Sequence, residues 1–404
     1  MTDPSAPLPR PRSDLTEPPD APQALSGALR VLQGRMLLHV SPARVGFLRP
    51  QLDAGCSGLV LCGPNALQQA KRLREAEGFN GPLLVDPGVY EVRAASEVDP
   101  FPDVSEGTFA FDDPLAVSLA EQRAAGVTAP MTPTGYLHAE DSDALKAAVR
   151  RVAALNDPQV VFAAPIDVGW LREEDSVRQL MACLRLVKGP KALMLGGQMD
   201  PLARHPRAVD HLRQIVAQVP GAALLRTDLA AFGALAAGAA FTAFGAGSRL
   251  RHVVAPGEKA KTSKKGGFSP SPHVLFPELM DFFLGKTLAE RFAGAPLPVC
   301  NCAACAGERA LDSFASNAGD RQARAAAHNV AVLMEWLRTL AAIAPGPARQ
   351  RWWQERCLAA VDRHPLLNAQ LRQPDRFKAP PQLKRWALAA PADEAAPLRV
   401  DARD

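Results

Sequence analysis

Short apolar runs alternate with longer amphipathic stretches between about residues 30 and 248. Runs this short and this apolar are typical of strands buried on both faces of a parallel sheet. They lie at Met36–Val40, Gly58–Cys62, Leu83–Asp86, Val127–Met131, Val160–Ala164, Ala192–Gly196, Ala222–Arg226 and Ala240–Gly245. Helical spacing of the apolar residues between them predicts helices that include Asn65–Glu77, Ser142–Leu155, Glu174–Lys188 and Val209–Val219. Strands that alternate with helices in this way favour an α/β protein, a (β/α)8 TIM-type barrel over residues 25–248, rather than an open doubly wound sheet.

The flanking regions have a different character. Residues 1–24 are rich in proline and are expected to form a disordered leader, and Tyr90–Pro114 is expected to be an insertion at the barrel rim. In residues 249–344 a basic loop precedes a helix-like stretch, His273–Glu290, then a cysteine cluster and an amphipathic helix at Asp320–Ile343. Residues 345–404 are expected to hold one helix around Trp352–Val361 and a proline-rich tail.

Composition narrows the class of protein. The formal net charge of +4 is too small to indicate a nucleic-acid partner by itself, so a basic surface has to be argued locally. No apolar run approaches the ~20 residues that span a bilayer, and the start of the chain has no apolar signal core. We therefore expect a cytoplasmic protein without membrane contact. Four of the seven cysteines are scattered among apolar residues, as small buried side chains are in a reducing compartment.

The other three cysteines form a candidate metal site. Cys300, Cys302 and Cys305 lie on one short loop, and His328 opens the apolar part of the later helix. Three thiolates and an imidazole complete the tetrahedral shell of one Zn²⁺, and a closed shell of protein ligands indicates a structural metal. The alternatives are a redox thiol cluster or a chance cysteine-rich loop and, for His328, an ordinary helix histidine.

A basic run follows the predicted barrel. Its cationic residues are Arg249, Arg251, Lys259, Lys261, Lys264 and Lys265, against one acid, Glu258. Lysines and arginines clustered in this way suit a phosphate backbone, which predicts a nucleic-acid-binding segment. The alternative is a solvated, flexible loop.

These residues together resemble the tRNA-guanine transglycosylase family. The resemblance lies in the Cys-x-Cys-x-x-Cys pattern followed by a His-Asn pair in a helix, and in Leu84–Glu91, which is similar to the family's Thr-Asp-Ser-Gly-Gly-Phe-Gln segment. It covers roughly residues 36–340. It implies a barrel with a zinc subdomain, and an enzyme that exchanges guanine in tRNA for a 7-deazaguanine base through an Asp nucleophile. By this resemblance Asp86 is an active-site residue; the alternative is a loop-capping Asp before Pro87.

The chain departs from the family at two carboxylates. The segment Gly238–Ala243, where the family has its nucleophile, contains no acid, and neither does Pro130–Thr132. Asp228 is our first choice for the second catalytic acid, with Asp167 and Asp200 behind it; the alternative for each is a helix-capping or loop role. Gly196 ends a predicted strand, Gly197 and Gln198 follow it, and all three are expected to bind substrate.

Three functional hypotheses follow. The first is base exchange in tRNA or DNA with a 7-deazaguanine-type base. The second is a non-catalytic, zinc-containing nucleic-acid-binding subunit that has lost the nucleophile. The third is a different barrel enzyme that acts on a free base or nucleoside, which the basic run disfavours. A homodimer or heterodimer through the zinc subdomain is also expected.

Overall fold

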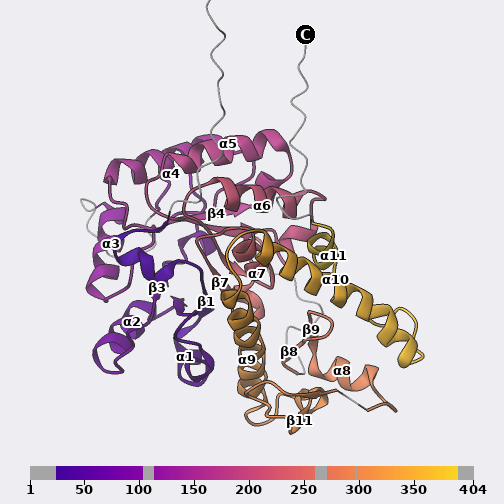
Figure 1. Cartoon of the computed structure of the whole chain (residues 1–404). Coiled ribbons are helices and arrows are strands. Elements are labelled where there is room, and N and C mark those ends of the chain that lie inside the picture. The colour runs from indigo at the N-terminus through magenta and orange to yellow at the C-terminus, as the bar shows by residue number, and fades with distance from the viewer. Residues whose placement is uncertain (1–23, 103–112, 260–270, 297, 390–404) are drawn as a thin grey trace, which may run out of the picture.

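The chain forms a mixed α/β fold around a curled parallel sheet (Figure 1). The computed structural model describes residues 24–102, 113–259, 271–296 and 298–389. Within them the main sheet has seven strands in the order β3-β2-β1-β7-β6-β5-β4. The strands are β1 (Arg35–Val40), β2 (Leu59–Cys62), β3 (Leu83–Asp86), β4 (Phe162–Asp167), β5 (Lys191–Gly196), β6 (Ala222–Thr227) and β7 (Phe241–Gly245).

The expected closed eight-stranded barrel is wrong. The sheet is a half-barrel, because the predicted strand Val127–Met131 is an irregular segment rather than a strand. That segment spans the gap between the two edge strands through single hydrogen bonds. The Thr128 amide donates to the Leu83 carbonyl (2.7 Å), and the Val161 amide donates to the Pro130 carbonyl (2.9 Å). Pro130 and Pro133 lack an amide hydrogen, so no regular ladder forms there.

Both faces of the sheet are covered, which explains the uninterrupted apolar runs. Alternate strand residues such as Leu37, Val60 and Met194 point to the concave side, where Leu29 and Leu32 of the N-terminal turn join them. The other set packs against the helices. These helices are α1 (Pro42–Leu48), α2 (Ala66–Glu75), α3 (Pro114–Ala124), α4 (Ser142–Leu155), α5 (Glu174–Arg185), α6 (Ala208–Gln218) and α7 (Ala230–Ala236). The predicted helices in this region are therefore confirmed.

In its described residues, the C-terminal part has two small hairpins and four α-helices. The hairpins are β8 (His273–Phe276) with β9 (Asp281–Leu284), and β10 (Val299–Cys300) with β11 (Arg309–Ala310). The helices are α8 (Gly285–Arg291), α9 (Arg321–Ala342), α10 (Pro347–Gln370) and α11 (Pro381–Leu388). The expected helix His273–Glu290 is wrong in its first half: two β-prone runs, His273–Phe276 and Asp281–Leu284, pair across a turn that begins with Pro277. The helix at Asp320–Ile343 is confirmed.

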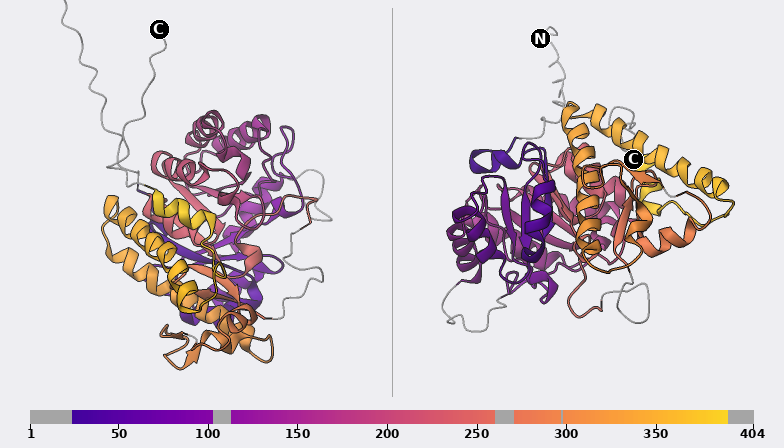
Figure 2. Two further views of the ribbon diagram at one scale, coloured as in Figure 1. Left: turned by 90° about the vertical axis from the view of Figure 1, so that its right-hand side faces the viewer. Right: turned by 90° about the horizontal axis from the view of Figure 1, so that it is seen from below.

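Helices α10 and α11 extend the C-terminal region beyond expectation. Instead of one short helix and a tail, residues 345–389 form two helices that gather away from the indigo N-terminal elements (Figure 2). They dock on α7 through aromatic side chains: the Trp353 ring stacks on Phe232 at 5.4 Å, and the Trp386 ring lies over Gly233. Residues 1–23 of the predicted leader, residues 1–24, lie outside the described residues, as does part of the expected rim insertion.

The close packing of Trp386 on Gly233 gives a stability test. A Cβ at Gly233 would lie 2.5 Å from the Trp386 ring, so Gly233→Ala should destabilise the fold by about 1–3 kcal/mol through overpacking. Gly46 of α1 is the matched control, since a Cβ there meets nothing within 4 Å; Gly46→Ala should stabilise the fold by up to about 1 kcal/mol. Urea denaturation measures both. Equal effects from the two substitutions would contradict this account of α11 docking.

Candidate functional site

The predicted metal ligands converge. Cys300, Cys302, Cys305 and His328 are all buried, and their ligand atoms lie within 4.8 Å of one another, so this cluster could hold one metal ion. The three sulfurs are almost equidistant from Nδ1 of His328, at 3.4, 3.5 and 3.4 Å. Ligands at the usual zinc–sulfur and zinc–nitrogen lengths in a tetrahedron are separated by about 3.5 Å. The donor set and its spacing therefore fit a tetrahedral ion.

The local fold explains why the thiols converge. Cys300 ends β10, and the turn after it is closed by the Gly307 amide, which donates to the Cys300 carbonyl (3.1 Å). The Cys305 and Ala306 amides both donate to the Cys302 carbonyl, at 2.9 and 2.8 Å. This tight turn brings the three side chains to one side of the loop, where His328 of α9 meets them.

The His-Asn pair attaches α9 to β8. Nε2 of His328 lies 2.9 Å from the Leu275 carbonyl, an acceptor, so this nitrogen carries the proton and Nδ1 presents its lone pair to the sulfurs. Asn329 completes the attachment: its Oδ1 accepts from the Leu275 amide (2.7 Å) and its Nδ2 donates to the His273 carbonyl (2.9 Å). The cluster thus joins β10, α9 and β8.

A second group of polar side chains surrounds Asp86 at the carboxyl end of β3. The Asp86 carboxylate is buried, accepts a hydrogen bond from the Tyr90 hydroxyl (2.5 Å), and lies 3.1 Å from Nε2 of His39 and 3.8 Å from Nη1 of Arg226. Burial alone would raise the pKa of Asp86, but contacts with His39, Arg226 and Tyr90 outweigh it and lower the pKa below its ordinary value. Asp86 is therefore ionised at neutral pH.

Arg226 contacts both Asp86 and Tyr90 of this group. It sits in β6 with a positive φ of 51°, at the irregular stretch between β6 and β7. Nη1 donates to the Tyr90 hydroxyl (2.7 Å) and to Glu91, and Nε donates to the His252 carbonyl (3.2 Å). Two carboxylates, Asp86 and Glu91, thus contact one guanidinium nitrogen. The Asp86 side chain is sealed from solvent, whereas the Glu91 side chain is 49% exposed.

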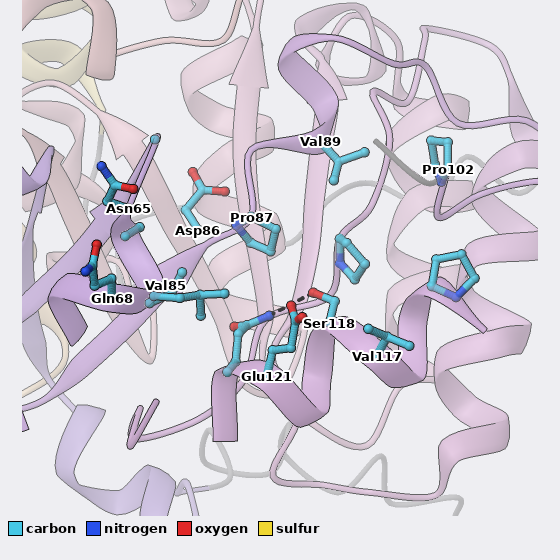
Figure 3. A pocket seen from close by; sticks show the side chains of 16 residues that line it. Asn65, Gln68, Val85, Asp86, Pro87, Val89, Pro102, Val117, Ser118 and Glu121 are labelled. Carbon is cyan, nitrogen blue, oxygen red and sulfur yellow. Dashed lines mark hydrogen bonds between the residues drawn. The ribbon is translucent and has the colours of Figure 1, made fainter. Parts of the chain in front are cut away.

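Asp86 also borders a cavity of about 510 Å3 (Figure 3). The cavity lies between the ends of β2 and β3 and the helices α2 and α3. Figure 3 shows Asp86, Pro87 and Val89 along one side, with Ser118 and Glu121 of α3 below. Among the described residues, its polar lining is made of neutral amides and a hydroxyl together with carboxylates, without a lysine or arginine. Such a lining offers hydrogen bonds to a neutral ligand rather than to a phosphate.

The structure does not bring the second proposed acid to Asp86. Asp228 accepts from the Ala230 amide (2.9 Å) at the start of α7 and from Nε2 of Gln382 (3.1 and 3.2 Å), and it lines a separate cavity of about 300 Å3. Asp200 lines that same cavity and accepts from the Ala203 amide (3.2 Å). Asp167 accepts from the Tyr136 hydroxyl (2.7 Å). All three also accept from nearby backbone amides, as the helix-capping or loop alternative predicts.

The expected substrate residues have local structural partners. The Tyr136 ring fills the space that a Cβ on Gly196 would need, and the Gly197 amide donates to the Val253 carbonyl (3.2 Å). Gln198 is buried and donates to Glu258 (2.6 Å). None of these three residues is among those lining the cavity beside Asp86. Their assignment to substrate stays a prediction.

The residues of the basic run differ in their exposure to solvent, and some of them lie outside the described residues. Arg249 and Lys259 are exposed. Arg251 is only 9% exposed, with its guanidinium 3.6 Å from the Phe282 ring centroid, so it faces the protein rather than solvent. Lys261, Lys264 and Lys265 lie outside the described residues. Of the residues of the run that the structure describes, only Arg249 and Lys259 have the exposure that a phosphate-binding surface requires.

Neither a family model nor a curated protein matches this chain. Among the described helices, none combines the length and the apolar character needed to span a bilayer. Sequence reasoning missed Glu91, His39 and Arg226. A signal for His39 was available in the sequence: it is a polar residue near the end of the apolar run Met36–Val40, as Asp86 is at the end of Leu83–Asp86.

The lowered pKa of Asp86 predicts a pH-dependent stability. Asp86→Asn should cost about 1–3 kcal/mol at pH 7, because it removes the charged partner of Arg226 and His39. A carboxyl whose pKa is lowered by folding stabilises the fold above its unfolded pKa, near 3.8, and this contribution is lost as the pH falls through the lower, folded value. The difference between wild type and variant should therefore narrow below about pH 4. Urea denaturation from pH 3 to 7 measures it.

The matched control for that experiment is Asp143→Asn. Asp143 forms an exposed pair with Lys146, and removing it should change stability by less than about 0.5 kcal/mol at any pH. A difference between wild type and Asp86→Asn that stays constant down to pH 3 would contradict the ionised state of Asp86.

Proposed function

We propose that this chain is a transglycosylase-like protein of the tRNA-guanine type, which exchanges a guanine in tRNA or DNA for a 7-deazaguanine-type base. The observation that carries the proposal is the carboxylate pair at the carboxyl ends of the strands. Asp86 and Glu91 contact the same nitrogen of Arg226, and Asp86 also borders the 510 Å3 cavity, whose described lining residues include no lysine or arginine. Carboxylates that act together at a sugar centre are typically about 5–9 Å apart.

Asp86 and Glu91 have different roles in the proposed reaction. Base exchange needs a carboxylate that displaces the outgoing base from C1′ of the ribose, and is itself displaced by the incoming base. Glu91 is the more accessible acid, whereas the sealed Asp86 holds Tyr90 and Arg226 in place. One proton goes to the leaving base and one is taken from the entering base, so the exchange needs no net proton source. The resemblance to the family makes Asp86 an active-site residue but does not assign it the role of nucleophile, and substitution distinguishes the roles of the two acids.

A second candidate function is nucleic-acid binding without turnover. It is favoured because each carboxylate that the sequence suggested already has a partner within the protein. For example, the buried Asp86 contacts Arg226, and Asp228 caps α7 and accepts a hydrogen bond from Gln382. Strand β7, where the family has its nucleophile, carries no acid. Arg249 and Lys259 would then serve as contacts for the phosphate backbone.

The Cys3His cluster is proposed to hold one structural Zn²⁺. Soft thiolates with one imidazole in a closed tetrahedron prefer zinc among the common cellular cations. The ion would supply no chemistry to the substrate, because the four protein side chains fill its coordination shell. Contact of a second chain with this subdomain also remains a proposal.

Metal analysis tests the zinc proposal. Protein purified without added zinc should carry one equivalent per chain, and Cys302→Ala should lose both metal and most of the folding free energy, since metal binding at such sites contributes on the order of 10 kcal/mol. Cys183→Ala is the matched control, because Cys183 is buried but lies on α5 and outside the cluster. A zinc-free wild type that melts cooperatively, or full metal content in Cys302→Ala, would defeat the proposal.

Incorporation of labelled guanine or a labelled 7-deazaguanine into bulk tRNA and into DNA tests the exchange. Wild type should incorporate label, and Asp86→Asn and Glu91→Gln should each lower the rate by at least about 100-fold. Asp228→Asn should retain activity. Circular dichroism checks that each variant is folded.

One further result would change the assignment of the second acid, and another would decide between the two candidate functions. Loss of activity in Asp228→Asn with retention in Glu91→Gln would restore Asp228 as the second catalytic acid. Binding of tRNA or DNA by wild type without incorporation of either base would overturn base exchange and support the non-catalytic reading.

A further inference from the structure

The second cavity, of about 300 Å3, contains charges that do not pair with one another. It lies where β6, β9, α10 and α11 meet, and its charged lining consists of Asp200, Asp228, Asp281 and Arg251. Within the described residues, Arg251 makes no ion pair within 4.0 Å with any of these three acids. Opposite charges in one partly buried space attract strongly, so their separation has to be maintained by other contacts.

Those contacts fix each charged side chain at its own place in the cavity lining. Asp228 is fixed by Gln382 and by the first turn of α7. Asp200 and Asp281 each use Oδ1 to accept a backbone amide, from Ala203 and Phe282 respectively. In the described part of the chain, Oδ2 of each has no hydrogen-bond partner. Two carboxylate oxygens are thus available to a ligand.

Arg251 provides the opposite charge. Its side chain is 9% exposed and is held by a hydrogen bond from Nε to the Gly245 carbonyl (3.2 Å) and by stacking on Phe282. Its two terminal nitrogens have no hydrogen-bond partner among the residues that the structure describes. A buried guanidinium without an anion is costly, which indicates a site for an anionic group.

Apolar side chains complete the lining. Met280, Phe282, Trp353 and Trp386 surround the charged groups. Nε1 of each tryptophan is buried and lacks a hydrogen-bond partner in the described residues. Aromatic faces suit ammonium groups and aliphatic stems, and unpaired indole N–H groups suit an acceptor oxygen.

We propose that this cavity binds a small zwitterion of net positive charge, of which a basic amino acid is the simplest form. Its ammonium groups would lie at Asp200, Asp228 and Asp281, and its carboxylate at Arg251. Three acids and one arginine are the complement of a ligand with two cationic groups and one anionic group. A simple diamine would leave Arg251 unpaired, and a simple carboxylate would leave the acids unpaired.

The ionisation of the cavity agrees with this charge pattern. Burial, together with the neighbouring Asp228, raises the pKa of Asp200 and of Asp281 to about 7 each. Burial lowers the pKa of His252 to about 4 and also lowers that of His273, so both are neutral at pH 7. The titratable and charged groups that face the two acids are Asp228, Arg251, His252, His273, Arg291 and Arg385. A cationic ligand favours the ionised acids, so its binding should release protons near pH 7 and tighten from pH 6 to pH 8.

Isothermal titration calorimetry of the full chain with L-lysine tests the proposal. At pH 8 we expect saturable binding of one equivalent, weakened at least about tenfold by Asp281→Asn, because a buried charge contact is lost. Cadaverine, which lacks the carboxylate, and norleucine, which lacks the second ammonium, should each bind at least about tenfold more weakly than lysine. Asp210→Asn is the control, since Asp210 is an exposed acid of α6, and it should bind lysine as wild type does.

Asp200→Asn serves as a second variant should Asp281→Asn fail to fold. Absence of saturable binding by lysine, arginine and ornithine would overturn the proposal. Unchanged lysine affinity in the folded Asp281→Asn or Asp200→Asn variant would also overturn it. Equal affinity for cadaverine and lysine would overturn the role of Arg251 and leave a plain cation site.

Discussion

A guanidinium buried at the carboxyl end of the sheet is the constraint on which the rest of this site depends. Arg226 is 6% exposed, and an unpaired charge at that depth would cost several kcal/mol. The fold supplies Asp86 from β3, Tyr90 and Glu91 from the turn after it, and the carbonyls of Arg249 and His252 from the segment after β7. Arg226 in β6 and Asp86 in β3 lie in strands on opposite sides of β1 and β7. The charge of one residue therefore fixes the relative positions of three distant parts of the chain.

The metal cluster has a comparable role in the C-terminal region. Hairpin β10–β11 is only four residues of paired strand and could not hold its shape by its own ladder. The four ligand side chains take the place of a hydrophobic core there, and the hydrogen bonds of Asn329 attach α9 to β8. Arg338 of α9 in turn pairs with Asp53 (2.7 Å), which joins this unit to the N-terminal part of the sheet. A metal ion at the cluster would thus support how α9 lies against the half-barrel, without contact with the cavity beside Asp86.

The sequence predicted what depends on local pattern and missed what depends on tertiary geometry. The seven strands and most helices were visible, because burial on both faces leaves uninterrupted apolar runs. The metal ligands were visible because three cysteines cluster within six positions. The segment Val127–Met131 has the apolar character of a strand, but Pro130 and Pro133 deny it a ladder. Asp228 and Arg251 looked available from the sequence, and only the packing of α11 and Phe282 shows what they contact.

The two arginines illustrate how the same residue type can have opposite consequences. Arg226 lies near the carboxyl end of β6 and Arg251 in the segment after β7, and both are at least nine-tenths buried. Arg226 donates to a carboxylate, a hydroxyl and two carbonyls, so its charge is satisfied within the protein. Arg251 has one carbonyl and an aromatic face, and three carboxyls lie across a cavity from it. Since the cost of burial is offset in the first case and not in the second, a bound ligand would contribute more stability beside Arg251 than beside Arg226.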